Sequence, residues 1–313
     1  MDAPATTTLQ SDEKIWAALA HASVLLFFFG PLIPLVVWST QRRKSSFVSF
    51  HALQAMSYQV LWYWFWILVG PVLMMLLFGA FILLAALSPT SADEPGVFAL
   101  GMQVVIWGGI LGSFALYMLL GVVGAGFCVA GREFRYPLMG RWTARFLDYQ
   151  AGGATSLNEA NEDRLVASLG HATAIITLWG LIFSLIAWVS EKERSLLLRF
   201  QLLQAVIYQG IGAVGYMGAM MLYMVMVFGM MAVMFSFDSS APENLGPLAA
   251  VLFILPILFI FFVFFVLGPI FLLLASWASL RVLRGHDYHY PFLGRFLARR
   301  MGSAPPAGAG ATQ

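Results

Sequence analysis

Residues 38–59 read WSTQRRKSSFVSFHALQAMSYQ, and residues 188–209 read WVSEKERSLLLRFQLLQAVIYQ. Extending this alignment without gaps over residues 13–59 and 163–209 gives 14 identical residues in 47 positions. A shared apolar composition alone does not keep the same polar residues in the same order. The sequence therefore indicates an internal duplication, with two repeats of one unit.

The composition is typical of a membrane protein. Hydrophobic residues make up 60% of the sequence and charged residues 10%, whereas soluble domains contain about 45–50% apolar residues. Each repeat has two uncharged runs (60–87 and 97–131, then 210–237 and 244–280) that exceed the ~20 residues a helix needs to cross a bilayer. Backbone groups in lipid must bond within their own segment, so these runs predict helices.

Both repeats have the same order of segments: a first apolar segment, a basic hairpin, two long apolar segments and a closing motif. We expect an all-α polytopic integral membrane protein made of two tandem homologous helical bundles with three long apolar segments each. The predicted divisions are a disordered tail (1–12), a first membrane repeat (13–145), a linker (146–161), a second membrane repeat (162–300) and a disordered tail (301–313).

The charges are distributed unevenly along the chain. Lysine and arginine occur in the hairpins, the closing motifs and the linker region, whereas the loops 88–96 and 237–246 carry acidic charges only. Cytoplasmic loops of membrane proteins are enriched in basic residues. The sequence therefore predicts a multi-pass protein of the bacterial plasma membrane with a cytoplasmic C-terminus.

The first apolar segment (15–38 and 165–190) has basic residues near both ends. Its 24 residues in the first repeat reach about 36 Å as a helix, enough for one crossing. Either the segment is broken or re-entrant and the repeats are parallel, or it crosses once and the repeats are inverted. Gly30, Pro31 and Pro34 are consistent with a break, and the equal charge bias favours parallel repeats. Six or eight crossings remain open.

Polar residues recur on one helical face at the start of the second apolar segment. Phe50, Gln54 and Tyr58 follow each other at a spacing of four residues, as do Phe200, Gln204 and Tyr208. Amides inside membrane helices bond across helices or line a polar path. Together with the histidines of the first segments, the candidate polar groove contains His21, His51, Gln54, Tyr58, Gln59, His171, Gln204, Tyr208 and Gln209.

The closing motif reads GREFRYPLMGRW at 131–142 and GHDYHYPFLGRF at 285–296. Proline stops the helix, while arginine and tyrosine are typical of the headgroup level of a membrane. The motif predicts cytoplasmic anchoring to lipid or docking of a partner. The candidate residues are Arg135, Tyr136, Pro137, Arg141, Tyr290, Pro291 and Arg295.

The sequence contains no familiar catalytic motif. We predict no enzymatic activity, no catalytic residues and no cofactor. The single cysteine, Cys128, is interpreted as a small apolar packing residue. No carboxylate or cysteine lies at a ligand spacing from His21 or His171, so we predict no metal site.

The motifs together resemble a known family. They are LAHAS and LGHAT around the two histidines, GPLIPLVVW at 30–38, the F-x-x-x-Q-A-x-x-Y-Q pattern at 50–59, and the Tyr-Pro closing signature. They are similar to the Tic-twenty-like family of bacterial membrane domains, related to a chloroplast inner-envelope import component. For the plastid relatives that resemblance implies a four-helix membrane component of a protein-conducting complex, and for the bacterial members it implies no established activity.

Two functions follow as hypotheses. The first is a non-enzymatic scaffold or a translocation-type component, because the duplication comes without catalytic residues. The alternative is a small-molecule or ion carrier with a polar path between the repeats that uses His21, His171, Gln54 and Gln204. The expected partners are the lipid bilayer and other membrane proteins. Nucleic acid is not expected, and the oligomeric state is left open.

Overall fold

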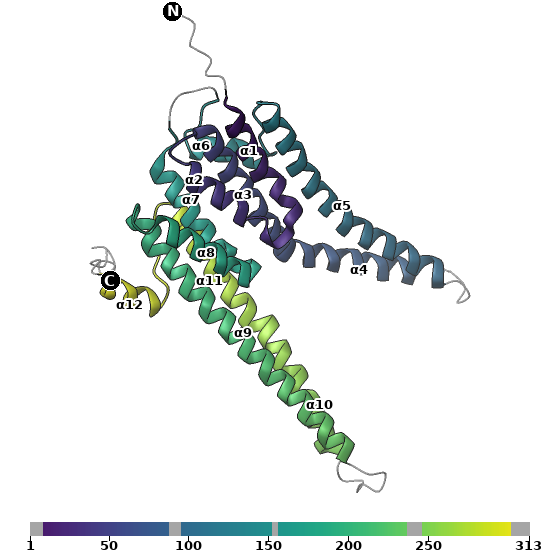
Figure 1. Ribbon diagram of the computed structural model, residues 1–313. Coiled ribbons are helices and arrows are strands. Elements are labelled where there is room, and N and C mark those ends of the chain that lie inside the picture. The colour runs from purple at the N-terminus through teal and green to yellow at the C-terminus, as the bar shows by residue number, and fades with distance from the viewer. Residues whose placement is uncertain (1–8, 88–94, 152–155, 237–245, 302–313) are drawn as a thin grey trace, which may run out of the picture. The chain divides into compact units, whose positions relative to one another are not determined.

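The computed structural model describes residues 9–87, 95–151, 156–236 and 246–301 (Figure 1). Within these ranges every regular element is a helix, as the composition predicts. The chain divides into two compact units, Met1–Leu169 and Gly170–Gln313. The division falls inside one helix, α7 (Glu159–Ala172).

The first unit contains a short broken segment, two long helices and a short closing helix. Helix α1 packs against α3 and α5, and α2 packs against α3. The core of the unit lies where α1, α2, α3 and α5 pack together, and Trp38, Phe50 and Met56 are fully buried there. The elements are α1 (Ser11–Ala22), η1 (Ser23–Phe29), α2 (Leu32–Gln41), α3 (Ser46–Leu68), α4 (Gly70–Leu87), α5 (Pro95–Val129) and α6 (Met139–Phe146).

The second unit repeats this order of elements. Helix α8 packs along α9, and α10 also packs against α9. The π-helical turn η4 lies between α10 and α11, so these three elements form the second long arm of the repeat. The elements are η2 (Thr173–Ile176), α8 (Leu178–Glu191), α9 (Leu196–Ser236), α10 (Gly246–Phe262), η4 (Val263–Leu267), α11 (Gly268–Leu283) and α12 (Leu293–Arg300).

The first apolar segment is broken in both repeats, which is the broken alternative of the two that the sequence left open. Phe27 has φ 47° and ψ −120°, and its equivalent Thr177 has φ 48° and ψ −114°. Side chains other than glycine rarely adopt a positive φ, so an α-helix cannot continue through either residue. In the first repeat Pro31 is the N-cap of α2, which begins at Leu32. Each repeat has two long apolar arms and one interrupted segment.

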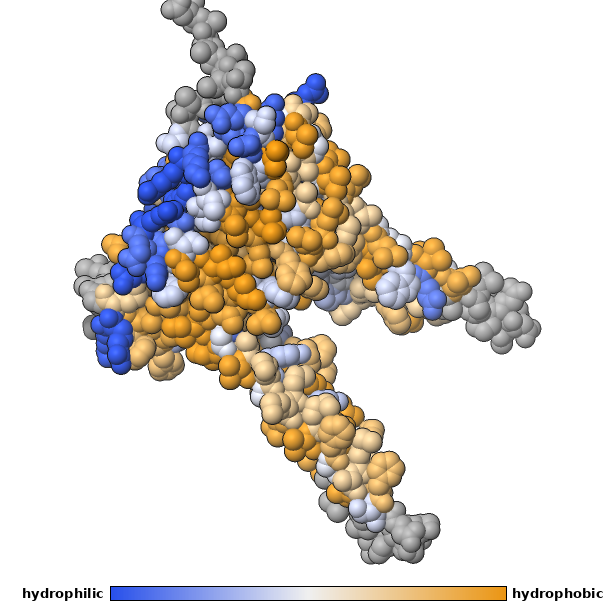
Figure 2. Space-filling view, in the orientation of Figure 1, coloured by the Kyte–Doolittle hydropathy of each residue, from blue (hydrophilic) through white to orange (hydrophobic). Residues whose placement is uncertain are grey.

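Four helical stretches of the described chain are long and apolar enough to cross a membrane: Ser46–Leu83, Leu100–Val129, Leu196–Ser236 and Phe253–Leu283. Many large apolar side chains on them are exposed, such as Met75, Leu111, Val225 and Phe265. Figure 2 shows hydrophobic residues along α9 and α10, and hydrophilic residues gathered at the end of the first unit that carries α6. This distribution is that of a multi-pass membrane protein.

Helices extend across several of the predicted segment boundaries. Helix α1 begins at Ser11, inside the stretch predicted as a disordered tail, and the predicted linker (146–161) includes the last residue of α6 and the start of α7. Residues 1–8, 88–94, 152–155, 237–245 and 302–313 lie outside the described residues, and with them most of both tails and of the two acidic loops.

Candidate functional site: a polar cluster in each repeat

Gln54 connects the closing motif of the first repeat to α3. Its side-chain Nε2 donates a hydrogen bond to the carbonyl oxygen of Phe134 (3.1 Å), and its Oε1 accepts one from the backbone N–H of Tyr136 (3.1 Å). Gly140 lies against the same amide, and a Cβ there would approach Oε1 of Gln54 to 2.5 Å. Glycine is therefore required in the motif because the backbone approaches this glutamine closely.

Gln204 makes the same pair of bonds in the second repeat. Its Nε2 donates to the carbonyl oxygen of Tyr288 (2.9 Å), and its Oε1 accepts from the backbone N–H of Tyr290 (3.1 Å). Gly294 is the equivalent of Gly140. A side-chain Cβ at this position would lie 2.9 Å from Oε1 of Gln204. Each glutamine thus satisfies two backbone groups of an extended segment that has no helix or sheet partner of its own.

The tyrosines of the polar face stack on the tyrosines of the closing motif. Tyr58 lies on Tyr136 with ring centroids 3.9 Å apart, and Tyr208 lies on Tyr290 at 4.0 Å. The hydroxyl of Tyr58 donates to the carbonyl oxygen of Tyr117 (3.2 Å). The hydroxyl of Tyr208 donates to the carbonyl oxygen of Phe271 (2.8 Å). Each tyrosine joins the second apolar segment to the third.

The two histidines occupy equivalent buried positions. Nδ1 of His21 lies 2.9 Å from the hydroxyl of Tyr136, and Nδ1 of His171 lies 3.1 Å from the hydroxyl of Tyr290. The other ring nitrogen differs in its partner: His21 Nε2 lies 2.9 Å from His51 Nδ1, whereas His171 Nε2 lies 3.2 Å from Gln201 Oε1. Burial raises the pKa of Tyr136 well above its ordinary value, so its hydroxyl keeps its proton at neutral pH.

The last glutamine of each motif bonds to the broken first segment. Gln59 Nε2 donates to the hydroxyl of Ser23 (2.8 Å). Gln209 Nε2 donates to the carbonyl oxygen of Gly170 (2.7 Å) and to the hydroxyl of Ser184 (3.2 Å). A break in a helix frees backbone groups that must find partners inside a membrane protein. These amides supply polar contacts beside the break.

The tyrosines of the closing motif are buried within the protein. Tyr136 and Tyr290 are 1% and 2% exposed, so their rings contact other side chains, and the headgroup level stays a prediction for both. The residues that follow Pro137 and Pro291 are exposed instead: Leu138 is 91% and Phe292 is 89% exposed. Both have a positive φ, 63° and 65°, and they immediately precede α6 and α12.

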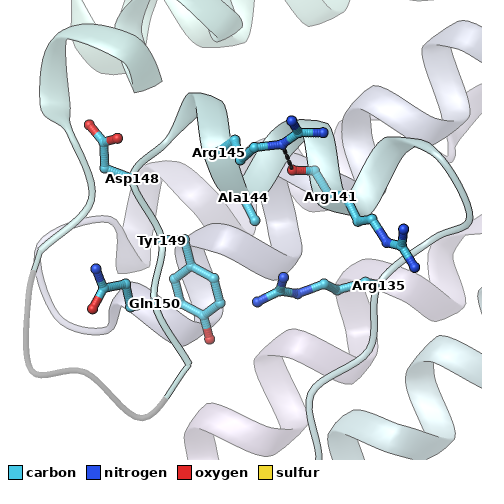
Figure 3. A pocket seen from close by; sticks show the side chains of 7 residues that line it. All are labelled: Arg135, Arg141, Ala144, Arg145, Asp148, Tyr149 and Gln150. Atoms are coloured by element: carbon cyan, nitrogen blue, oxygen red, sulfur yellow. Dashed lines mark hydrogen bonds between the residues drawn. The ribbon is translucent and has the colours of Figure 1, made fainter.

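The first repeat has an arginine-lined pocket beside α6. Its volume is about 610 Å³. Figure 3 shows Arg135 directed toward Tyr149, whose ring stacks on Phe50 with centroids 4.0 Å apart. Arg135 also donates to Glu133 (2.6 Å). The lining residues are Arg135, Arg141, Ala144, Arg145, Asp148, Tyr149 and Gln150.

A buried carboxylate pair holds the start of α7 within the first unit. Arg42 lies 2.8 Å from Asp163 and 3.5 Å from Glu162, and the Glu162 side chain is almost fully buried. Burial raises the pKa of Glu162 to about 7, against the opposing effect of Arg42. Glu162 is therefore a group that titrates near neutral pH in the folded protein.

The family model for magnetosome magnetite crystal formation proteins, MamF/MmsF, matches residues 12–143 and 162–297. These two matches cover most of the chain, once for each repeat. The chain belongs to the MamF/MmsF family. No curated protein and no solved structure matches it.

Membership in the MamF/MmsF family overturns the resemblance to the Tic-twenty-like family. The motifs behind that resemblance are short, and the structure shows them in use as hydrogen-bonding contacts between helices. The protein-conducting role that the resemblance implied therefore loses its support. The internal duplication is supported, because the MamF/MmsF model matches in two tandem regions.

In this MamF/MmsF member the predicted polar residues gather in two clusters, one within each unit. The first cluster contains His21, His51, Gln54, Tyr58 and Tyr136, and the second contains His171, Gln201, Gln204, Tyr208 and Tyr290. A groove between the repeats stays a prediction, as does anchoring or docking at Arg135, Arg141 and Arg295.

Sequence reasoning missed two residues: Gln201 in the second cluster, and Cys128, which lies beside the first. Gln201 takes the position of His51, 150 residues later, and was left out of the groove although the alignment shows it. Cys128 lies 3.6 Å from Nδ1 of His51 although 77 residues separate them. No spacing rule finds such a contact, because the two residues come from different helices.

Proposed function

We propose that this chain is a non-enzymatic scaffold of the magnetosome membrane that acts in magnetite crystal formation. The family match over both repeats supports the process. The scaffold role is supported by the arrangement of polar residues: Gln54 and Gln204 both bind backbone groups of the closing motif within their own repeat.

The hydrogen bonding of the two clusters favours a scaffold over a carrier. A carrier needs polar groups that are free to bind a solute along a path. Both side-chain atoms of Gln54 have backbone partners, and the hydroxyl of Tyr58 donates to a carbonyl oxygen. Hydrogen bonds of this kind between membrane helices stabilise the bundle by about 0.6–2 kcal/mol each. The clusters are thus suited to holding helices together.

The arginine-lined pocket is the proposed docking surface of the scaffold. Three arginines and one aspartate line it, which gives it a net positive charge. Arginine binds carboxylates through paired N–H donors, so an acidic segment of a partner protein fits this chemistry. Arg141 and Arg145 lie on α6, a short helix whose one-turn spacing places both side chains at the same rim.

A charge-reversal variant tests the docking surface. Arg141→Glu combined with Arg145→Glu should abolish co-purification of partner proteins from mild detergent, while the chain itself stays in the membrane fraction. The control is Arg299→Glu combined with Arg300→Glu on α12, two exposed arginines that do not line the pocket. Equal recovery of partners with both double variants would contradict docking at this pocket.

The role in crystal formation is tested in magnetosome-forming cells that lack this chain. Cells complemented with the wild-type chain should recover the crystal size distribution seen by electron microscopy, and cells complemented with the docking variant should not. Unchanged crystals in cells without the chain would contradict the proposed function.

Accessibility labelling distinguishes the scaffold from the carrier. Cysteines introduced one at a time at Gln54, Tyr58, Gln204 and Tyr208 should be protected from an impermeant thiol reagent added to either side. Labelling from both sides would instead support a polar path through the protein. Cys128 is fully buried and gives the background signal.

A further inference from the structure

Three side chains with metal-ligating atoms meet inside the first repeat. His21 comes from α1, His51 from α3 and Cys128 from the end of α5, and all three are fully buried. Their nearest ligand atoms lie within 4.8 Å of one another. His51 Nδ1 is 2.9 Å from His21 Nε2 and 3.6 Å from Cys128 Sγ.

We propose that His21, His51 and Cys128 bind one soft transition-metal ion, copper(I). Two imidazoles and one thiolate form a donor set that copper and zinc accept, and thiolate sulfur favours copper(I). This inference does not depend on the proposed scaffold function, because it rests on the side chains alone.

The geometry is close to that of a coordinated ion. Three ligands around one ion lie about 120° apart, so metal–nitrogen bonds of about 2.0–2.1 Å and metal–sulfur bonds of about 2.3 Å place the ligand atoms about 3.6 Å (N to N) and about 3.8 Å (N to S) apart. The His51 to Cys128 distance of 3.6 Å is within about 0.2 Å of this value. The His21 to His51 distance of 2.9 Å has to open by about 0.7 Å.

The surroundings of His21 set its tautomer, so that its Nε2 is the atom that would bind the metal. Nδ1 of His21 is 2.9 Å from the Tyr136 hydroxyl, so it can carry the proton and donate to that oxygen. A metal-bound histidine usually donates its other ring N–H to a partner, which sets the tautomer. Phe134 packs against the His21 ring and Phe47 against the His51 ring, which makes the site apolar.

His51 is incompletely bonded as a structural histidine. Its Nε2 has no hydrogen-bond partner within the described part of the chain, although the residue is fully buried. In the proposed site the metal bonds to Nδ1 of His51, so the other ring nitrogen, Nε2, carries the ring proton.

The charge balance favours copper(I) over zinc(II). Binding releases the thiol proton of Cys128, so the ligands contribute one negative charge. With copper(I) the site is neutral, whereas with zinc(II) it carries a net positive charge. An unbalanced charge in an apolar interior is costly, so the monovalent ion is preferred.

The second repeat contains the same framework and keeps one ligand, His171 in place of His21, but lacks the other two. Gln201 stands in place of His51, and Val282, three residues before the closing motif, stands in place of Cys128. Gln201 bonds to His171 (3.2 Å) and to the carbonyl oxygen of Tyr288 (3.2 Å). The fold is therefore compatible with glutamine and valine at these positions, so His51 and Cys128 are not needed for packing alone.

The test uses the full chain purified in detergent. Copper(I) is supplied without oxygen in competition with a chelator, unbound metal is removed by gel filtration, and the metal is measured per chain. The wild type should retain about one copper ion. His51→Gln and Cys128→Val should each retain less than about a tenth of that, and both variants carry the residue that the second repeat already has.

A gain-of-site variant makes the test independent of folding losses. Gln201→His combined with Val282→Cys should raise the retained copper to about two ions per chain. Equal copper in the wild type and in Cys128→Val, or none in the wild type, would overturn the site. Retention of zinc(II) in preference to copper(I) would overturn the assignment of the ion.

Discussion

Glu162 is a carboxylate whose protonation depends on the fold. Its residue surface is 1% exposed, and burial raises its pKa to about 7 from an ordinary value of 4.5. Between these two values the folded protein holds a proton that the unfolded chain has released. The folding free energy therefore becomes less favourable as the pH rises from about 4.5 to about 7, and it is constant above that range.

Removal of this charge should flatten the pH profile. A pKa shift of this size changes the free energy of unfolding by on the order of 3 kcal/mol across the pH range. We expect the wild-type unfolding temperature to fall between pH 5 and pH 8, and that of Glu162→Gln to change less. Thermal unfolding in detergent at four pH values measures both. Glu159→Gln, an exposed change in the same helix, is the control, and parallel profiles for wild type and Glu162→Gln would contradict the assignment.

At the scale of elements, the interrupted first segment is the most unusual feature of each repeat. The break falls at equivalent residues, Phe27 and Thr177, and a glutamine of the second apolar segment, on α3 or α9, bonds beside it. A β-branched residue such as Thr177 is strongly disfavoured at a positive φ. Backbone strain of this kind costs about 1–3 kcal/mol and persists where the surrounding packing imposes it.

Glycine at the break should stabilise the protein. Thr177→Gly removes the side chain that makes φ 48° unfavourable, so we expect the free energy of unfolding to rise by about 1 kcal/mol. Val189→Gly, an exposed change inside α8, should lower it by about 1 kcal/mol. Urea-induced unfolding in mixed micelles compares the two. A loss of stability in both variants would show that the break lies elsewhere.

At the scale of the whole molecule, each repeat forms its own set of hydrogen bonds between a glutamine and the closing motif. The partners of Gln54 are Phe134 and Tyr136, and those of Gln204 are Gln201, Tyr288 and Tyr290. The two sets have no member in common. Changes at sites without shared partners usually add in their effect on stability.

Substitution of the two glutamines should therefore be additive. Gln54→Leu and Gln204→Leu each leave a backbone N–H and a carbonyl without their partner, a loss of about 2–4 kcal/mol. The double variant should show the sum of the single losses within about 0.5 kcal/mol. Unfolding of all four proteins in the same detergent checks this. A double variant no worse than the poorer single one would indicate that the clusters act as one unit.

The sequence predicted the all-helical membrane class and the duplication because both depend on composition and on residue order. It also predicted that Gln54, Tyr58 and their equivalents share a helix face. The burial of Tyr136 and Tyr290 could not be predicted, because it depends on a glutamine of another helix that binds the backbone of the closing motif. The cluster of His21, His51 and Cys128 depends on three helices meeting, which local patterns do not encode.

The exposed apolar residue before each closing helix has a further consequence. Leu138 and Phe292 stand almost fully out from the protein next to α6 and α12, which carry arginines. A short helix with one apolar and one cationic side lies in the plane of a membrane surface and inserts its apolar side chains between headgroups. Such insertion is sensitive to membrane curvature, because bending spreads the headgroups of the outer layer.

We therefore expect the protein to prefer strongly curved membranes. In giant vesicles, the wild-type chain should be enriched in thin tubules drawn from the surface, and Leu138→Ser combined with Phe292→Ser should remove that enrichment. Even distribution of the wild type between tubule and vesicle would contradict this expectation. A protein with this property would gather on small vesicles because of their shape, before any binding partner is present.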